Sequence, residues 1–128
     1  MDVRGAVVLA EELSRSTFAG VNITALVHTN MASPHLANAG SPEQKQKYLP
    51  DIIAGKKITA ICVTEPGAGS DVAGIRTRAV QDGNDWIING SKIFITNGVY
   101  GDLYFVAAKT DPTAKGSRGI SMFIVEKG

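Results

Sequence analysis

Two short segments of the chain hold the residue types that are best suited to binding chemistry. Residues 61–71 begin as an apolar run and end in hydroxyl, carboxyl and glycine residues, and residues 92–98 follow the same plan and end in Thr96, Asn97 and Gly98. Such ends place backbone N–H donors and small hydroxyls at the mouth of a sheet, where glycines let an anion approach closely. This arrangement suits a flat cofactor that forms hydrogen bonds and carries phosphate.

The glycines of the first segment match neither of the common nucleotide-binding loops. Val72 stands where the dinucleotide-binding fingerprint needs its third glycine, and no P-loop lysine follows. On the pattern alone, a tight turn after a strand is favoured over a phosphate-binding loop at residues 67–70. Glu65 and Asp71 have the residue types of an acid–base pair, but the position of Glu65 before Pro66 favours a structural role.

The composition is that of an ordinary globular domain. Hydrophobic residues make up 44% and charged residues 20% of the 128 residues, and the net charge of +1 gives no reason to expect nucleic acid or an anionic membrane as a partner. No apolar run approaches the ~20 residues of a membrane span. Cys62 is the only cysteine, so a buried, inert thiol in a reducing compartment is expected. His28 and His35 lack partners at metal-ligand spacing, so no metal site is expected.

The first part of the chain is predicted to be helical. Apolar residues recur at three- and four-residue spacing through residues 3–54. Gly40 is typical of a helix C-terminus, and Ser41 then begins a new helix with a capping box that Gln44 completes. Pro50 is expected to kink or end this helix at the preceding residue.

After residue 56 the helical spacing gives way to short β-forming runs. Strands are predicted at residues 58–63, 76–80, 86–89, 92–96, 103–109 and 120–127. Asn89 and Gly90 form the strongest hairpin signal, and residues 81–84 mark another turn. We therefore predict an α+β fold, in which a helical N-terminal segment is followed by a small antiparallel β-barrel or sandwich domain.

The two binding segments together resemble the middle domain of the acyl-CoA dehydrogenases, flavoenzymes that introduce a double bond beside an acyl thioester. The resemblance continues through residues 71–77, 86–92 and 119–126, and in the helical part through residues 28–30 and 44–50. It implies that residues 1–56 are the C-terminal part of an N-terminal helical domain and that residues 57–128 are a middle β-domain facing flavin and acyl-CoA. The first third looks closest to long-chain members.

The resemblance also implies binding residues for FAD and for the acyl-CoA substrate. The FAD-binding residues that it implies are Ile61, Cys62, Val63, Thr64, Gly67, Gly69, Ser70, Phe94, Ile95 and Thr96. The acyl-CoA-binding residues are Ser70, Ser117 and Arg118, of which Arg118 could pair with a CoA phosphate through its planar guanidinium. An exposed hairpin tip with a solvated arginine explains residues 113–119 equally well. Many relatives have an aromatic residue in place of Ile61 and a tryptophan in place of Phe94, and both replacements keep the wall of the site apolar.

The implied reaction is the oxidation of a saturated acyl-CoA to the trans-2-enoyl-CoA, in fatty-acid or branched-chain acyl catabolism. The flavin supplies the redox chemistry, while the protein positions and tunes it. The resemblance implies that electrons pass to an electron-transferring flavoprotein. A homo-oligomer, either a tetramer or a dimer, is expected for the full-length form, located in a bacterial cytoplasm or the mitochondrial matrix.

The catalytic base of this family comes from the helical domain that follows the β-domain, where a glutamate removes the α-proton. No residue here matches it, so we assign no catalytic residue and expect the chain to be an inactive fragment of a larger dehydrogenase. Two alternatives remain at this point. One is a short, non-catalytic protein that binds flavin or CoA, and the other is an assembly subunit that lends its β-domain to a partner chain.

Overall fold

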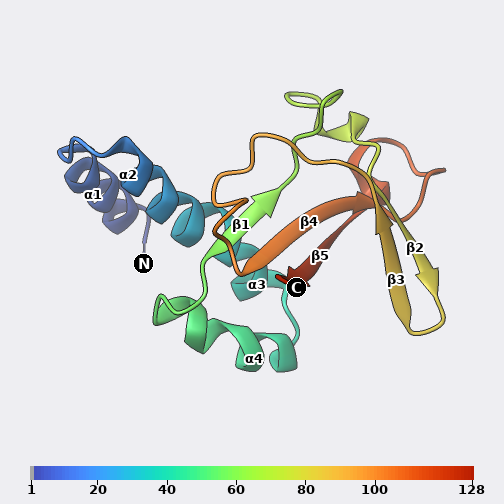
Figure 1. The fold of residues 1–128 in the computed structure, drawn as a ribbon, viewed down its shortest axis with the longest axis horizontal. Helices are drawn as coiled ribbons and strands as arrows, with labels where there is room; N and C mark the ends of the chain where they lie inside the picture. Colours follow the sequence, from blue (N-terminus) through green and yellow to red (C-terminus); the bar gives the residue numbers. More distant parts are fainter. Residues whose placement is uncertain (1) are drawn as a thin grey trace.

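The structure, a computed structural model that describes residues 2–128, consists of a helical part followed by a sheet (Figure 1). The helical elements are α1 (Val3–Ser14), α2 (Ala19–Leu26), the π-helical turn η1 (Val27–Ala32), α3 (Ser33–Ala39) and α4 (Pro42–Ile53). The sheet contains β1 (Thr59–Cys62), β2 (Arg78–Asp82), β3 (Asp85–Asn89), β4 (Leu103–Lys109) and β5 (Ile120–Glu126), and the 3₁₀ turns η2 (Val72–Gly74) and η3 (Gly116–Gly119) precede β2 and β5. Within residues 2–128, no helix has the length and apolar character needed to cross a bilayer.

Two of the helices begin at side-chain caps that are encoded locally. At the start of α4, the Ser41 hydroxyl accepts a hydrogen bond from the Gln44 backbone N–H at 3.2 Å, and the Gln44 side chain accepts one from the Ser41 N–H at 2.9 Å. The Asp2 carboxylate caps α1 by accepting from the Gly5 N–H at 2.9 Å. These caps satisfy backbone donors that the first helical turn leaves free. The predicted capping box is confirmed.

Of the two residues expected to mark helix ends, Gly40 ends α3 as predicted, and Pro50 does not end α4. Pro50 was expected to kink or end the helix; it lies inside α4, which continues to Ile53, so the helix does not end at the preceding residue. An interior proline removes a helical hydrogen bond, but the burial of Tyr48 and Ile52, at 8% and 3% exposed, outweighs that loss. Gly40 caps α3 with a φ of −67°, which is not left-handed. Glycine is required there for space, because a Cβ would lie 2.6 Å from the Leu36 carbonyl oxygen.

The strands form one open, mixed sheet with β4 at its centre. β4 pairs with β1 in parallel and with β5 antiparallel, and the β2–β3 hairpin joins it through a single parallel pairing of Arg78 with Lys109. The prediction of helices followed by a small β-domain is confirmed, but the sheet is not a closed antiparallel barrel. Alternating apolar residues indicate which face of a strand is buried, whereas they do not indicate its partner or direction.

The hairpin predicted at Asn89 and Gly90 is wrong. The hairpin instead joins β2 to β3 through the predicted turn at residues 81–84, where Gly83 has the positive φ of 60° that suits a tight turn. Residues 90–102 contain no strand, so the strand predicted at residues 92–96 is wrong as well. This irregular segment returns the chain to the beginning of β1, where the Leu103 N–H donates to the Ile58 carbonyl, and β4 therefore runs parallel to β1.

The main core lies between β4 and the helices α3 and α4, which pack near one end of the sheet (Figure 1). Its buried residues are Ala32, Leu36, Tyr48, Ile52, Leu103 and Phe105. Leu103 and Phe105 are 0% and 2% exposed, and a large apolar side chain stabilises the fold by about 1.5–3 kcal/mol when it is fully buried. This core holds β4, and through its pairing it also holds β1.

His28 connects η1 to α4 and to the first residue of β1. Its Nε2 lies 3.2 Å from the carbonyl oxygen of Ile52, and its Nδ1 accepts a hydrogen bond from the Thr59 backbone N–H at 3.1 Å. A carbonyl oxygen can only accept and a backbone N–H can only donate, so the neutral ring carries its proton on Nε2. The side chain thereby sets where β1 begins relative to the helices.

Candidate functional site

The residues that follow β1 lie beside residues 93–96, and the two segments form a cavity with η1. The Ile93 N–H donates to the Thr64 carbonyl at 3.0 Å, which joins the two segments directly. The cavity has a volume of about 180 Å³. It is lined by Val27, Met31, Ile61, Val63, Thr64, Phe94, Ile95 and Thr96. Six of the residues predicted to bind FAD therefore line one cavity.

The alternation of β1 decides which of its side chains reach the cavity. Ile61 and Val63 line it, and both are apolar. Successive side chains of an extended segment point to opposite faces, so Cys62 lies on the other side and is buried, with 5% exposed. Burial raises the pKa of the Cys62 thiol, which agrees with an inert thiol. The structure does not place Cys62 among the cavity residues.

Phe94 occupies an unusual backbone conformation at the cavity. Its φ is 55°, in the left-handed region, and it is 90% exposed. A bulky residue with positive φ is strained by about 1–3 kcal/mol, and such strain gathers at functional sites. An exposed aromatic side chain held in this conformation is available to pack against a bound molecule. Thr64 and Thr96 add two hydroxyl groups to the same lining.

The glycine loop after β1 is a tight turn. The Glu65 and Ala68 backbones exchange two hydrogen bonds, of 2.9 Å and 3.1 Å, in agreement with the turn favoured by the pattern. Gly67, Gly69 and Ser70 are exposed, and they do not line the cavity beside Thr64. Gly67 instead lines a separate hollow of about 240 Å³, together with residues such as Arg76 and Gly90.

Ser117 and Arg118 lie in η3 and are exposed. η3 contacts η2, the turn that directly follows the glycine loop. η3, which contains Ser117 and Arg118, therefore lies beside the turn that begins two residues after Ser70 (Figure 1). They are separate from the cavity that contains Phe94.

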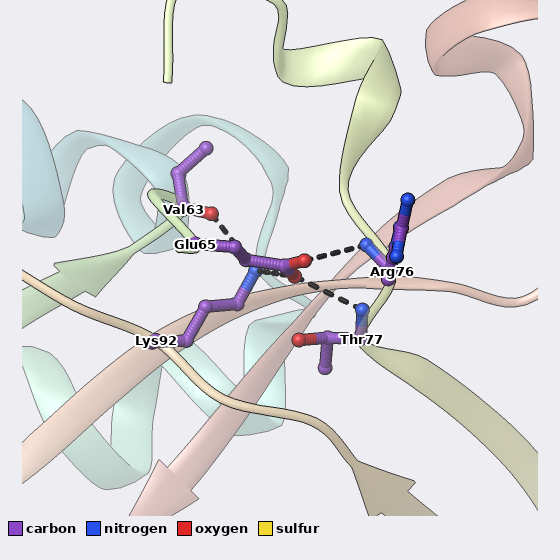
Figure 2. A network of polar contacts seen from close by, with 5 residues as sticks. All are labelled: Val63, Glu65, Arg76, Thr77 and Lys92. Carbon is purple, nitrogen blue, oxygen red and sulfur yellow. Dashed lines mark hydrogen bonds and ion pairs between the residues drawn. The ribbon is translucent and has the colours of Figure 1, made fainter. Parts of the chain in front are cut away.

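Glu65 is buried, with 6% exposed, and Figure 2 shows the polar network around it. Its carboxylate accepts hydrogen bonds from the backbone N–H groups of Arg76 and Thr77, at 2.6 Å and 3.0 Å, and from the Lys92 ammonium at 2.8 Å. Burial raises the pKa of a carboxyl group, but these hydrogen bonds outweigh it and lower the pKa of Glu65 from its ordinary 4.5 to about 2. Lys92 also donates to the Val63 carbonyl at 2.9 Å. Glu65 therefore has the structural role that its position before Pro66 favoured.

Three residues at the site were not found from the sequence. Val27 and Met31 belong to the π-helical turn η1 and line the cavity, and such turns occur often at functional sites. The sequence pattern placed Lys92 only at the start of the segment 92–98, without a role of its own. No local signal in the sequence pairs Lys92 with a carboxylate 27 residues earlier.

Comparisons with known proteins match nearly the whole chain. The family model of the acyl-CoA dehydrogenase middle domain matches residues 60–128, and that of the N-terminal domain matches residues 1–56. The chain is 46% identical to the mitochondrial long-chain specific acyl-CoA dehydrogenase of Sus scrofa, over 99% of this chain and 29% of that protein.

Solved structures agree with the sequence comparisons. A crystal structure of acyl-CoA dehydrogenase from Geobacillus kaustophilus has 49% identity and a TM-score of 0.87, over 99% of this chain and 33% of that one. The FAD complex of PigA has 36% identity and a TM-score of 0.90, over 96% of this chain and 32% of that one. The chain thus spans about a third or less of the length of the proteins that it matches. Since the middle-domain model alone covers more than half of the residues, the chain belongs to the acyl-CoA dehydrogenase family.

Proposed function

We propose that this chain forms part of the FAD and acyl-CoA sites of a dehydrogenase that converts a saturated acyl-CoA to the trans-2-enoyl-CoA. The observation that carries the proposal is the cavity in which Ile61, Val63 and Thr64 face residues 94–96. These two segments lie some thirty positions apart in the sequence, and both lie within the residues that match the acyl-CoA dehydrogenase middle domain. Residues 1–56 and 57–128 are the helical and middle-domain contributions to that enzyme.

The residues of the cavity fit one side of a flavin ring. Ile61, Val63 and Phe94 supply apolar contacts, and the hydroxyls of Thr64 and Thr96 supply hydrogen-bonding groups for ring nitrogen and oxygen atoms. When bound, FAD accepts the hydride that the substrate loses. Each neutral hydrogen bond contributes roughly 0.5–1.5 kcal/mol net, so burial of the ring must supply much of the affinity. Gly67, Gly69 and Ser70 are proposed to hold the phosphate-bearing part of the cofactor.

The acyl-CoA contacts are proposed for Ser70, Ser117 and Arg118. The contact between η2 and η3 supports this proposal, because η3 contains Ser117 and Arg118 and η2 begins two residues after Ser70. The exposed Arg118 guanidinium can pair with a CoA phosphate. The α-proton is removed in this family by a glutamate of the helical domain after the middle domain, and we name no residue of this chain for that role.

The same family assignment supports the remaining partners. The proposed electron acceptor is an electron-transferring flavoprotein, and the proposed location is a bacterial cytoplasm or the mitochondrial matrix. Val99 and Tyr100 are 76% and 79% exposed, and large apolar side chains gathered on a surface are typical of contact surfaces. This supports a homo-oligomer, a dimer or a tetramer.

The proposal is tested by titrating the purified chain with FAD and following flavin fluorescence. The Phe94→Ala variant removes an aromatic wall of the cavity and is expected to weaken FAD binding about 3- to 10-fold. Phe18→Ala is the matched control, since it removes another exposed phenylalanine side chain, 71% exposed, that lies outside the cavity. Equal FAD affinity of Phe94→Ala and the wild type would show that the cavity does not hold the flavin.

A further inference from the structure

Three segments that are distant in the sequence meet at the Glu65 carboxylate. Glu65 itself lies in the turn after β1, Arg76 and Thr77 lead into β2, and Lys92 follows β3. Both members of the ion pair are withdrawn from solvent, since the side chains of Lys92 and Glu65 are 12% and 6% exposed. Figure 2 shows the Lys92 ammonium directed toward both Glu65 and the Val63 carbonyl.

The irregular segment 90–102 depends on such contacts, because no strand pairing holds it. Lys92 and the Ile93 N–H bind it to the carbonyls of Val63 and Thr64. At its other end, the Asn97 side chain donates to the Thr59 carbonyl at 3.0 Å. Residues 94–96, which line the cavity, are therefore held between two attachments to the β1 segment.

The geometry points to the Glu65–Lys92 ion pair as the positioning device of the flavin cavity, which sets residues 94–96 at their distance from Val63 and Thr64. This inference rests on the proposed flavin site. Neither residue lines the cavity, so the pair acts through its neighbours and not by contact with the cofactor. The inference gives Glu65 and Lys92, which have no proposed binding or catalytic function, a positioning role.

An ion pair suits this task because it is directional and hard to displace. The Lys92 ammonium has three donors, of which two are directed to Glu65 and to the Val63 carbonyl. Removal of one partner leaves the other as an unpaired buried charge, which is strongly unfavourable. The left-handed Phe94 adds strain to the same segment, so the attachments on both sides are needed to keep it in place.

The test uses Lys92→Met, which keeps the apolar stem and removes the ammonium. Lys47→Met is the matched control, because Lys47 pairs with Glu126 at 2.7 Å on an exposed surface that is not part of the cavity. Two quantities are measured for each variant at a temperature well below unfolding. The first is hydrogen–deuterium exchange of residues 90–102 without FAD, and the second is the FAD dissociation constant together with the flavin absorption spectrum.

Lys92→Met is expected to exchange faster across residues 90–102, to bind FAD about tenfold more weakly, and to shift the flavin spectrum, whereas Lys47→Met matches the wild type. Faster exchange with unchanged FAD affinity and spectrum would overturn the inference and leave the proposed function standing. If the wild-type chain does not bind FAD, the proposed function fails, and the exchange data still decide whether Lys92 holds the segment. Exchange equal to the wild type overturns the inference in either case.

A double variant covers the case in which Lys92→Met does not fold. Glu65→Gln combined with Lys92→Met leaves no unpaired buried charge, so its fold is expected to survive. It lacks the ammonium that holds segment 90–102, and it is expected to bind FAD as weakly as Lys92→Met. A folded double variant with wild-type FAD affinity and exchange would refute the positioning role.

Discussion

The buried position of Glu65 makes its contribution to stability predictable in size and in pH dependence. The folded-state pKa of Glu65 is about 2, against an ordinary value of 4.5 in the unfolded chain. At neutral pH this difference corresponds to about 3 kcal/mol of stability. Replacing Glu65 by glutamine removes that contribution and leaves the buried Lys92 ammonium without an opposite charge, with only neutral acceptors such as the Val63 carbonyl. A loss of about 3 kcal/mol is a large share of the 5–15 kcal/mol that is typical of a domain.

The pH dependence follows from the direction of the pKa change. Between about pH 2 and pH 4.5 the unfolded chain binds more protons at Glu65 than the folded chain does, so stability rises with pH in this range. The contribution is complete above the unfolded value of 4.5 and disappears as the pH falls through about 2. At pH 3, which lies between the folded and unfolded pKa values, the difference between the wild type and Glu65→Gln is therefore expected to shrink to roughly half of its value at pH 7.

Urea unfolding followed by circular dichroism at pH 7 and pH 3 measures both differences. Other carboxyl groups titrate in the wild type and the variant alike, so their effects cancel in the comparison. Glu126→Gln is the control, because its carboxylate pairs with Lys47 on the exposed surface and its removal should cost little. A difference between the wild type and Glu65→Gln that is the same at pH 7 and pH 3 would refute the assignment of the low pKa to Glu65.

Three further predictions concern the fold that positions the site. Pro50→Ala is expected to raise the free energy of unfolding by about 1–3 kcal/mol, because alanine restores an interior helical hydrogen bond of α4; an unchanged urea midpoint would contradict this. Gly90→Ala is expected to destabilise the chain by more than about 2 kcal/mol, since its Cβ would collide with the Thr77 hydroxyl and lie 2.7 Å from the Thr77 Cα. A melting temperature equal to that of the wild type would show that Gly90 and Thr77 are not so close. Long-range ¹⁵N–¹H spectra are expected to show neutral His28 protonated on Nε2, and a proton on Nδ1 would exclude the contact with the Thr59 N–H.

Several features of this protein follow from local sequence alone. The capping box at Ser41 and Gln44 needs only residues three positions apart, and the structure confirms it. The strand predicted at residues 103–109 is β4 to the residue, because its alternating apolar side chains and their β-forming types act locally. The two segments that meet at the cavity were also recognisable, since each carries its glycine, hydroxyl or aromatic residues in a short run.

The tertiary structure decided everything that depends on which segments meet. The parallel pairing of β1 with β4 and the irregular path of residues 90–102 come from packing between elements, and the residue pattern of one strand does not specify its partner. The continuation of α4 through Pro50 is also a result of packing, because burial of Ile52 outweighs a local preference.

The cavity shows the same division between local and long-range information. Ile61, Thr64 and residues 94–96 could be proposed from sequence, but the π-helical turn that adds Val27 and Met31 could not. The pairing of Lys92 with Glu65 was equally hidden, because it joins residues that are 27 positions apart. Residue types and short spacings therefore identified the groups that can bind a cofactor. Their arrangement around one cavity was determined by long-range contacts, whose energies depend on distances that exist only in the folded chain.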